Sequence, residues 1–410
     1  VRSRRQRQMC IRDRPKEGSH YDLPIALGLM AALGAIPPGE LAAYAVLGEL
    51  SLDGSIVAVN GVLPAAMAAN AGGLGLICPQ ACGSEAAWAS ADMRIVAARN
   101  IIQIANHFRG TQILDRPTPV SRAASVSPLD MEHIKGQDEA RRALEVAAAG
   151  GHNLLFCGPP GSGKSMLAQR LPSILPPLSP RELLEVSMIS SIAGELAEGR
   201  LSASRPFRAP HHSASMAAMI GGGQKARPGE VSMAHQGVLF LDELPEFAPA
   251  VLDSLRQPIE SGEAVVARVN HRITYPARFQ LVAAMNPCRC GMAGEPGHVC
   301  ARGPRCQSDY QARVSGPFMD RIDLRMSVPA VTVADLMVQR PSETSASVAE
   351  RVAAARQVQH RRYTAMGLAE GYVNARCSAA EIEAAAALDA DGRSMMAAAA
   401  DRLRLSARAF

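Results

Sequence analysis

Residues 153–165 read NLLFCGPPGSGKS, and the helical run MLAQRL follows them. NLLFC is a buried-strand pattern, and the loop Gly158-Pro159-Pro160-Gly161-Ser162-Gly163-Lys164-Ser165 leads from that strand into the helix. Glycines let backbone N–H groups close on phosphate oxygens, and the helix amino terminus adds a favourable potential. Lys164 would reach the β- and γ-phosphates of a nucleotide, and the Ser165 hydroxyl would bind Mg²⁺. The order strand, glycine loop, helix therefore predicts a nucleotide-phosphate site.

Two further apolar runs predict strands that end at the same edge of the sheet. The run GVLFL at residues 237–241 ends in Asp242 and Glu243. Asp242 can hold Mg²⁺ through water, and Glu243 can polarise the water that attacks the γ-phosphate. The run FQLVAAM at residues 279–285 delivers Asn286, whose amide can orient that water without adding charge. The alternatives, an acidic strand cap and a polar turn residue, are disfavoured by the phosphate loop upstream.

The charge balance gives no support for a nucleic-acid partner. The 410 residues contain 43 Lys plus Arg and 38 Asp plus Glu, a net charge of +5. Residues 1–14 hold six arginines and one aspartate, and the other residues carry equal numbers of each sign. Those fourteen residues have no apolar period and resemble translated adaptor sequence. We therefore expect a non-native tail there, with a basic nucleic-acid arm as the alternative.

Nothing in the sequence predicts a membrane span, because no apolar run approaches the ~20 residues that a spanning helix needs. Residues 23–37 follow arginines as in a secretory signal, but the acids Asp13, Glu17 and Asp22 separate the two parts. The nine cysteines are an odd number, and four of them cluster within residues 288–306, unlike a secreted disulfide scaffold. We expect a cytoplasmic protein.

The periodicity predicts an α/β protein of two domains followed by a helical region. The first domain has helical stretches at 23–35 and 64–71, and strands at 45–52, 56–59 and 74–78. The predicted parts are 1–14, the tail; 15–110, the first α/β domain; 111–128, a linker rich in Pro, Ser and Thr; 129–335, the nucleotide-binding α/β domain; and 340–410, the helical region.

The motifs GPPGSGKS, GVLFLDE, AAMNPC and SGPFMDRID resemble, in this order, those of AAA+ ATPases. FRAPHHSASMAAMIGGG and PGEVSMAHQGVLFLDELPEF are typical of the magnesium-chelatase-like group of the YifB/ComM (competence protein) family. The resemblance covers nearly all of residues 15–410. It implies a Lon-protease-like domain of ribosomal S5 domain 2-like fold, then a P-loop AAA+ domain with a helical lid. It also implies a homo-hexameric ATPase that uses ATP and Mg²⁺.

The resemblance assigns two arginines to the ATP site. Arg321 in DRID matches the finger that a neighbouring subunit contributes, worth ~10³–10⁵ in rate. The alternative is a surface pair between Arg321 and Asp323 worth under ~1 kcal/mol. Arg408 in LSAR matches the sensor-2 arginine that reaches the γ-phosphate of its own subunit. The chain ends at Phe410, where family members continue with a further helix, so we expect a truncated lid.

A hairpin is predicted from two strand-like runs, residues 264–269 and 272–275, separated by Asn270-His271. In the resembling family such a hairpin lines the ring pore and contacts DNA. This assigns sequence-independent phosphate contacts to Arg268, His271 and Arg272. The alternative is an ordinary solvated hairpin.

Lys164 and Asp242 are further apart in sequence than a strand-to-strand crossover requires. In the resembling family the surplus is an insert that projects toward the ring pore. It contains the adjacent His211 and His212, which we expect to pack or hydrogen-bond within a loop, because neighbouring residues do not face one metal site on a helix.

Cys288, Cys290, Cys300 and Cys306 could supply four thiolates to Zn²⁺. Their intervals differ from the usual two-residue knuckle spacing, and the sequence contains no Cys-x-x-Cys pair. Reduced cysteines in a loop are therefore the favoured interpretation.

Three functions are compatible with the resemblance: a DNA motor, the ATPase motor subunit of a magnesium chelatase, and a Lon-like ATP-dependent protease. Lon enzymes use a Ser–Lys dyad, but Ala65 occupies the lysine position here, and Ser19 has no evident base. Chelatase motor subunits lack the Lon-like domain and the insert. The resemblance thus favours a DNA helicase that promotes branch migration in recombination and natural transformation, acting on single-stranded or branched DNA.

Overall fold

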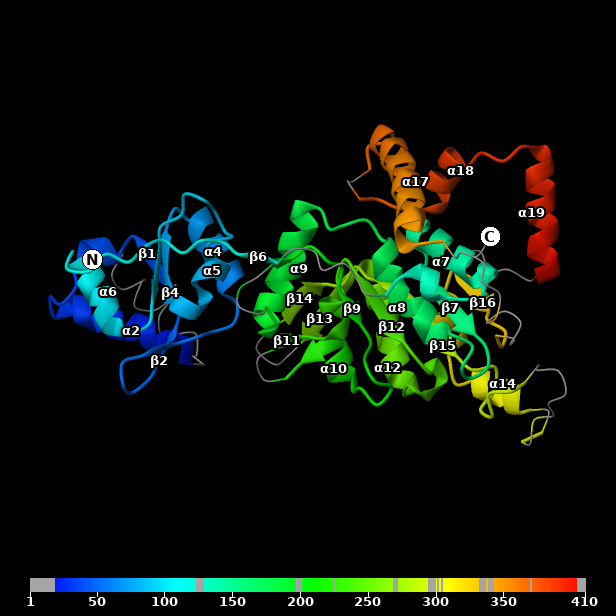
Figure 1. The fold of residues 1–410 in the computed structure, drawn as a ribbon, viewed down its shortest axis with the longest axis horizontal. Helices are drawn as coiled ribbons and strands as arrows, with labels where there is room; N and C mark the ends of the chain where they lie inside the picture. Colours follow the sequence, from blue (N-terminus) through cyan, green and yellow to red (C-terminus); the bar gives the residue numbers. More distant parts are fainter. Residues whose placement is uncertain are drawn as a thin grey trace. The chain divides into compact units, whose positions relative to one another are not determined.

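The computed structural model describes residues 19–122, 129–196, 199, 201–223, 226–267, 272–293, 300, 302–303, 305–331, 337, 343–368 and 371–403. The chain forms two compact units (Figure 1). The smaller comprises Val1–Ala123 and Leu183–Ser202, and the larger comprises Ala124–Glu182 and Ala203–Phe410. Within the described ranges, no helix is both long enough and apolar enough to cross a bilayer.

A five-stranded parallel sheet forms the centre of the larger unit. The strand order is β16-β7-β15-β12-β9, so strands that are distant in sequence become neighbours. In register, Leu154 of β7 lies beside Val282 of β15 on one side and Leu324 of β16 on the other. The strands are β7 (Leu154–Cys157), β9 (Phe207–Arg208), β12 (Val238–Leu241), β15 (Gln280–Met285) and β16 (Leu324–Ser327).

Helices cover both faces of this sheet, which explains why its central strands read as continuous apolar runs. Along β7, Leu154 and Phe156 pack into one core and Leu155 packs into the other, as the two-residue period of a strand requires. One core includes α7 (Asp138–Gly150), α8 (Lys164–Ile174) and α17 (Ser345–Ala365). The other includes α10 (Met216–Ile220), α11 (Glu230–Met233), α12 (Pro249–Ser254) and α15 (Gly316–Met319).

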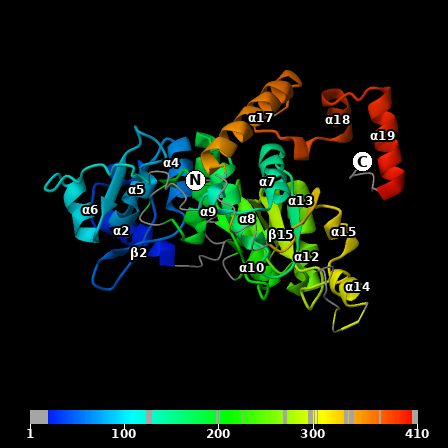
Figure 2. The ribbon, with the colours of Figure 1, turned by 45° about the vertical axis from the view of Figure 1, so that its right-hand side comes forward.

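The helical C-terminal region begins with α17, which packs on α7 and α8 (Figure 2). The side chains of Val348 and Val352 are buried in that contact. Arg351 donates to both oxygens of Glu145 on α7, at 2.8 and 3.1 Å. The region continues with η6 (Asn374–Arg376), α18 (Ala379–Ala385) and α19 (Ala390–Leu403). The remaining elements of this unit are η3 (Met131–His133), β10 (Gly221–Gly222), β11 (Arg227–Pro228), η5 (Leu244–Glu246), α13 (Arg256–Ser261), β13 (Glu263–Ala267), β14 (Arg272–Pro276) and α14 (Cys306–Gln311).

The smaller unit contains a three-stranded parallel sheet of order β1-β4-β5 and a separate β2–β3 hairpin. The single strand expected at residues 45–52 is wrong, because the chain breaks it at Gly48. A Cβ on Gly48 would lie 2.8 Å from Leu23 Cδ2, so the backbone there runs against α2. The elements are η1 (Ser19–Tyr21), α2 (Asp22–Ala32), α3 (Pro38–Leu41), β1 (Tyr44–Val46), β2 (Glu49–Leu50), β3 (Ile56–Val57), α4 (Val62–Ala71), β4 (Gly75–Pro79), η2 (Gln80–Cys82), α5 (Gly83–Ala86), β5 (Ile95–Ala98) and α6 (Ile101–Phe108).

Residues 183–202 lie between β7 and β12 in sequence but belong to the smaller unit. They include most of α9 (Pro180–Ala193), in which the Ser191 carbonyl accepts from the Gly61 N–H at 3.0 Å. The Ser191 hydroxyl donates to the buried Glu85 carboxylate, which also accepts the Leu63 N–H at 2.9 Å. β8 (Leu201–Ser202) pairs in parallel with β6 (Ser121–Arg122), inside the segment expected to be a linker.

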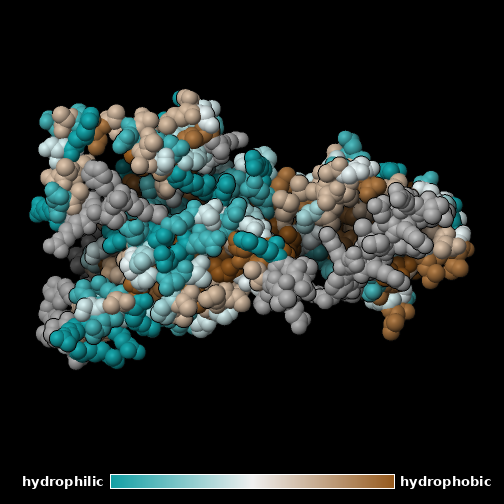
Figure 3. All heavy atoms as spheres, turned by 180° about the vertical axis from the view of Figure 1, so that it is seen from behind, coloured by the Kyte–Doolittle hydropathy of each residue, from teal (hydrophilic) through white to brown (hydrophobic). Residues whose placement is uncertain are grey.

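The surface differs between the two units. Hydrophilic residues predominate on the face of the larger unit that is drawn in Figure 3. The smaller unit exposes several large apolar side chains, and those of Leu29, Leu33 and Leu52 are all more than half exposed. The side chains of these leucines lie outside the core. The core of this unit is formed by buried residues of α2, α4 and the strands, among others.

Candidate functional site

The glycine loop lies between β7 and α8, at the carboxyl end of the parallel sheet. Gly163, the residue before α8, has φ +94°, a left-handed conformation that favours glycine. At Gly158 a Cβ would lie 2.0 Å from the Val328 carbonyl oxygen, so no larger residue fits. The backbone thus forms a tight turn that ends on the amino terminus of a helix, an arrangement suited to bind phosphate.

Lys164 lies folded over this loop and is 7% exposed. Its ammonium donates to the carbonyl oxygens of Gly158 and Pro159, both at 2.8 Å, and to Asn286 Oδ1 at 3.2 Å. Burial lowers the pKa of Lys164 from its ordinary value, and the Asp242 carboxylate opposes this effect. The structure thus places the lysine and the amide at the end of β15 in one cluster, as their positions after two buried strands suggested.

Ser165 and Asp242 meet beside the loop. The Ser165 hydroxyl donates to Asp242 Oδ2 at 2.7 Å, although the two residues are far apart in sequence. They come together because β7 and β12 both adjoin β15 and run parallel, so their carboxyl ends share an edge. A hydroxyl and a carboxylate are oxygen donors that suit Mg²⁺.

Glu243 turns away from the strand direction immediately after Asp242. Its φ is +51°, which is uncommon for a residue with a side chain. Asp242 Oδ1 accepts the Glu243 N–H at 2.9 Å and supports this turn. The Glu243 carboxylate lies 3.2 Å from His212 Nδ1. His212 follows β9, the neighbour of β12, so two adjacent strand ends bring these side chains together.

The two histidines differ in their contacts. His211 Nδ1 lies 2.8 Å from the Ser213 hydroxyl, a hydrogen bond within the loop as expected. The two imidazole rings lie with centroids 4.0 Å apart and are tilted by 35° to each other. The contact between His212 and Glu243 was missed from sequence. The His pair follows β9 after Ala209 and Pro210, and a strand of two residues leaves almost no signal in the sequence.

Gln137 is a second residue that sequence reasoning missed. Its side-chain amide donates to the Ser162 carbonyl at 3.3 Å and to the Pro329 carbonyl at 2.6 Å. It precedes α7 with φ +58°. Gln137 therefore connects the phosphate loop to the chain that leaves β16.

Arg321 lies at the other end of the sheet. Its carbonyl accepts the Asn153 side-chain amide at 2.9 Å, and Asn153 directly precedes β7, whereas the phosphate loop follows β7. The length of that strand, ~13 Å at ~3.3 Å per residue, separates the two positions. The Arg321 guanidinium is paired with Glu260 on α13. Asp323, the partner considered from sequence, accepts the Asn153 N–H at 2.8 Å and lies 3.7 Å from His152 Nδ1.

The hairpin expected before Asn286 is present as β13 and β14, paired antiparallel from Glu263 with Pro276 to Ala267 with Arg272. β13 runs from Glu263 to Ala267, and the last two residues of the expected strand, 268 and 269, lie outside the described residues. Arg272 is exposed at the start of β14. Arg268 and His271 lie outside the described residues, as does Arg408 of the lid.

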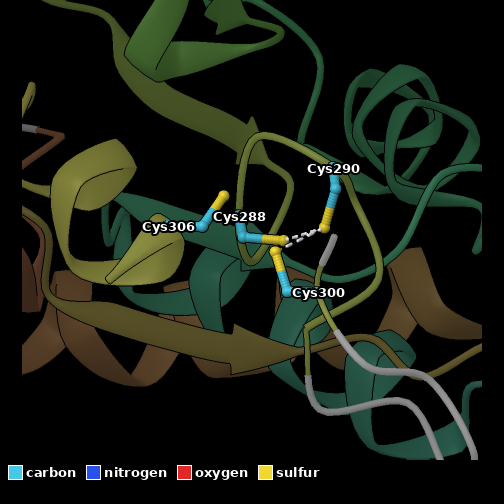
Figure 4. Close-up of side chains that lie close together, drawn as sticks. All are labelled: Cys288, Cys290, Cys300 and Cys306. Atoms are coloured by element: carbon cyan, nitrogen blue, oxygen red, sulfur yellow. Dashed lines mark hydrogen bonds between the residues drawn. The ribbon is translucent and has the colours of Figure 1, made fainter. Parts of the chain in front are cut away.

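The four cysteines of the 288–306 segment converge. The sulfur atoms of Cys288, Cys290, Cys300 and Cys306 all lie within 4.8 Å of one another (Figure 4). The unusual sequence intervals therefore do not keep these thiols apart.

Comparisons with known proteins match most of the chain. Family models described as magnesium chelatase, subunit ChlI, match residues 130–336 and 9–82, and a model of the ChlI C-terminal part matches residues 342–410. Competence protein ComM of Haemophilus influenzae is 41% identical over 404 residues, 97% of this chain and 77% of that protein. YifB of Salmonella typhimurium is 41% identical with the same coverage.

A more distant relative is the magnesium-chelatase 38 kDa subunit of Rhodobacter capsulatus, 30% identical over 43% of this chain and 56% of that protein. A cryo-EM model of the complex between magnesium chelatase subunits BchI and BchD covers 66% of this chain and 74% of its own, at 21% identity. Its TM-score of 0.36 is too low to support an argument.

Proposed function

This chain belongs to the ComM/YifB family of magnesium-chelatase-like AAA+ ATPases, and from that premise we propose that it is a DNA-dependent ATP-hydrolysing motor that acts as a homo-hexameric ring. One observation carries the proposal: Lys164, Ser165, Asp242 and Asn286 converge at one edge of the sheet, with Glu243 beside them. These side chains can bind phosphate and Mg²⁺ and activate water for phosphoryl transfer, and Arg321 of a neighbouring subunit would complete the site.

Each residue has a role that follows from its chemistry. The loop from Gly158 to Gly163 surrounds the phosphates with N–H groups, and Lys164 exchanges its carbonyl partners for phosphate oxygens. Ser165 and Asp242 would hold Mg²⁺, which would neutralise phosphate charge when bound. Glu243 accepts the proton of the attacking water, and Asn286 orients that water.

Arg321 acts in this proposal on the nucleotide of a neighbouring subunit. Its position at the amino end of β7 excludes a direct contact with the phosphate loop of its own chain. A ring with one site between each pair of subunits would bring the guanidinium to the phosphate of the neighbour. Arg408 would contact the γ-phosphate from the lid of its own subunit.

DNA is the proposed partner, and the β13–β14 hairpin is the proposed contact. Arginines at a hairpin tip can neutralise backbone phosphates irrespective of sequence, and Arg272 lies exposed next to that tip. Strand separation and branch migration during recombination and transformation are consistent with the competence relative. The protein would work in the cytoplasm.

A second candidate is the ATPase motor subunit of a magnesium chelatase, favoured by the family model over residues 130–336. A Lon-like protease is less well supported, because Ala65 on α4 stands where a dyad would need lysine. A paired assay separates the first two. We expect the ATPase rate to rise with single-stranded or branched DNA. No response to DNA, together with Mg²⁺ insertion into a porphyrin when chelatase partner subunits are added, would favour the chelatase.

A further inference from the structure

Four thiols gather in the segment that connects Asn286 to α14. Cys288 and Cys290 lie in the turn after β15, Cys300 lies further along the loop, and Cys306 is the first residue of α14. The sulfur of Cys290 is 2.8 Å from that of Cys288 and 3.2 Å from that of Cys300 (Figure 4). All four are free cysteines, and Cys288 and Cys306 are buried.

The distances fit a single tetrahedral ion. Four thiolates about 2.3 Å from one Zn²⁺ have sulfur atoms roughly 3.8 Å apart. The observed sulfur atoms, all within 4.8 Å of one another, need only small shifts to reach this geometry. An iron–sulfur cluster divides four thiolates between two or four iron atoms, so thiolates on different irons must lie further apart than four thiolates on one ion.

Backbone N–H groups face two of the four sulfurs. The N–H groups of Cys290, Met292 and Ala293 are directed at Cys288 Sγ, and the N–H of Arg302 is directed at Cys300 Sγ. Such donors orient and stabilise metal-bound sulfur. Arg289, Arg302 and Arg305 lie in the same segment, and their charges offset the net negative charge of four thiolates on a divalent ion.

We propose that Cys288, Cys290, Cys300 and Cys306 bind one Zn²⁺ as a closed structural site. Since all four positions of the ion are filled by protein, the metal would not take part in chemistry. The bound Zn²⁺ would cross-link the loop after Asn286 to the first residue of α14.

The loop that zinc would hold in place lies against the phosphate-binding loop. A Cβ on Gly291 would lie 2.8 Å from Pro160 Cδ, so the turn that holds Cys288 and Cys290 lies directly against the phosphate loop. On the other side, the Gln311 side chain of α14 donates to the Pro287 carbonyl at 3.1 Å. The zinc site would thus fix the backbone between Asn286 and α14 beside the nucleotide.

The test is the metal content of the full chain, purified without chelators and without a metal affinity column. Mass spectrometry of the elements should find roughly one zinc per chain. Replacing zinc by Co²⁺ should give the sulfur-to-cobalt absorption and strong visible bands of a tetrahedral tetrathiolate. A folded wild-type chain without stoichiometric zinc, a chain that carries iron, or a Cys288–Cys290 disulfide would each overturn the proposal.

Two variants and a control locate the site. Cys300→Ser and Cys290→Ser should each lose at least about nine-tenths of the zinc, because three thiolates bind far more weakly than four. Cys377→Ser, whose thiol contacts Tyr363 and lies outside the cluster, should keep it. Zinc retained in Cys300→Ser would contradict the ligand set. Metal content is measured without nucleotide or DNA, so this result is independent of the proposed motor function.

Discussion

His212 Nδ1 lies 3.2 Å from Glu243 Oε2 and connects the loop after β9 to the end of β12. The His212 ring also meets the Phe247 ring edge-on at 6.5 Å, so the imidazole is held from a second side. Glu243 has a left-handed backbone and a half-exposed side chain. The histidine is therefore the contact that sets the direction of the proposed catalytic carboxylate.

His212→Ala should lower kcat about tenfold, equivalent to about 1.4 kcal/mol in the barrier, and leave KM for ATP nearly unchanged. Without the His212 contact the Glu243 side chain samples more conformations. Its carboxylate is then less often in position to accept the proton of the attacking water. His212→Asn carries an amide N–H near the position of Nδ1 and should recover most of the rate. Steady-state ATPase kinetics of the wild type and the two variants test this prediction. Equal kcat for His212→Ala and wild type would show that His212 does not position Glu243.

Arg321 should act across a subunit boundary. Arg321→Ala alone and Lys164→Ala alone should each lose nearly all hydrolysis. A mixture of the two should recover a measurable part, because some boundaries then combine an intact phosphate loop with an intact Arg321. The ATPase rate of mixtures at several ratios tests this, and a mixture that never exceeds its inactive components would exclude action in trans.

The hairpin arginines should couple hydrolysis to DNA. Replacing both Arg268 and Arg272 by Ala should abolish the rise in ATPase rate on adding DNA, and should reduce the salt dependence of DNA binding because fewer counterions are released. Arg361→Ala, on the exposed side of α17, is the control and should respond to DNA like the wild type. If DNA raised the ATPase rate of the double variant as much as that of the wild type, these two arginines would not be the DNA contact.

The stability contributed by the ion pair between Glu145 on α7 and Arg351 on α17 should depend on pH. Hydrogen bonds from Arg351 lower the pKa of Glu145 below its ordinary value of 4.5. A carboxylate with a lowered folded pKa stabilises the fold above the unfolded pKa, and this contribution is lost as the pH falls through the folded value.

Glu145→Gln should therefore reduce the free energy of unfolding by about 1–2 kcal/mol near neutral pH, a figure kept small because Arg351 is partly exposed. The difference from wild type should shrink below pH 4.5. Glu350→Gln, at an exposed position of α17 beside Arg351, should show no such pattern. Urea unfolding over a pH series measures both, and a difference that persists in acid would contradict the assignment.

Much of the site could be predicted from sequence because its residues follow the carboxyl ends of strands. Three apolar runs, followed by the glycine loop with Lys164, by Asp242 and by Asn286, predicted that these residues would share a sheet edge. The structure brings them together, with Lys164 3.2 Å from Asn286. This inference works because parallel strands align their carboxyl ends, which makes position after a strand equivalent to position in space.

Other features could not be predicted because they depend on contacts between segments without a local pattern. β9 has only two residues, so the strand before His212 gives almost no periodic signal. The segment 183–202 is bound to the smaller unit by Glu85 and by a two-residue strand pair. The partner of Arg321, Glu260, lies on a separate helix, whereas sequence proximity suggested Asp323.

The most direct test of the account compares Glu243→Gln with Lys164→Ala for binding and hydrolysis of ATP. Glutamine preserves the shape of Glu243 but cannot accept a proton, whereas alanine removes the phosphate-binding charge of Lys164. We expect Glu243→Gln to bind ATP as tightly as the wild type and to hydrolyse it at least ~10²-fold more slowly. Lys164→Ala should neither bind nor hydrolyse. Undiminished turnover by Glu243→Gln would contradict the proposal that this sheet edge hydrolyses ATP.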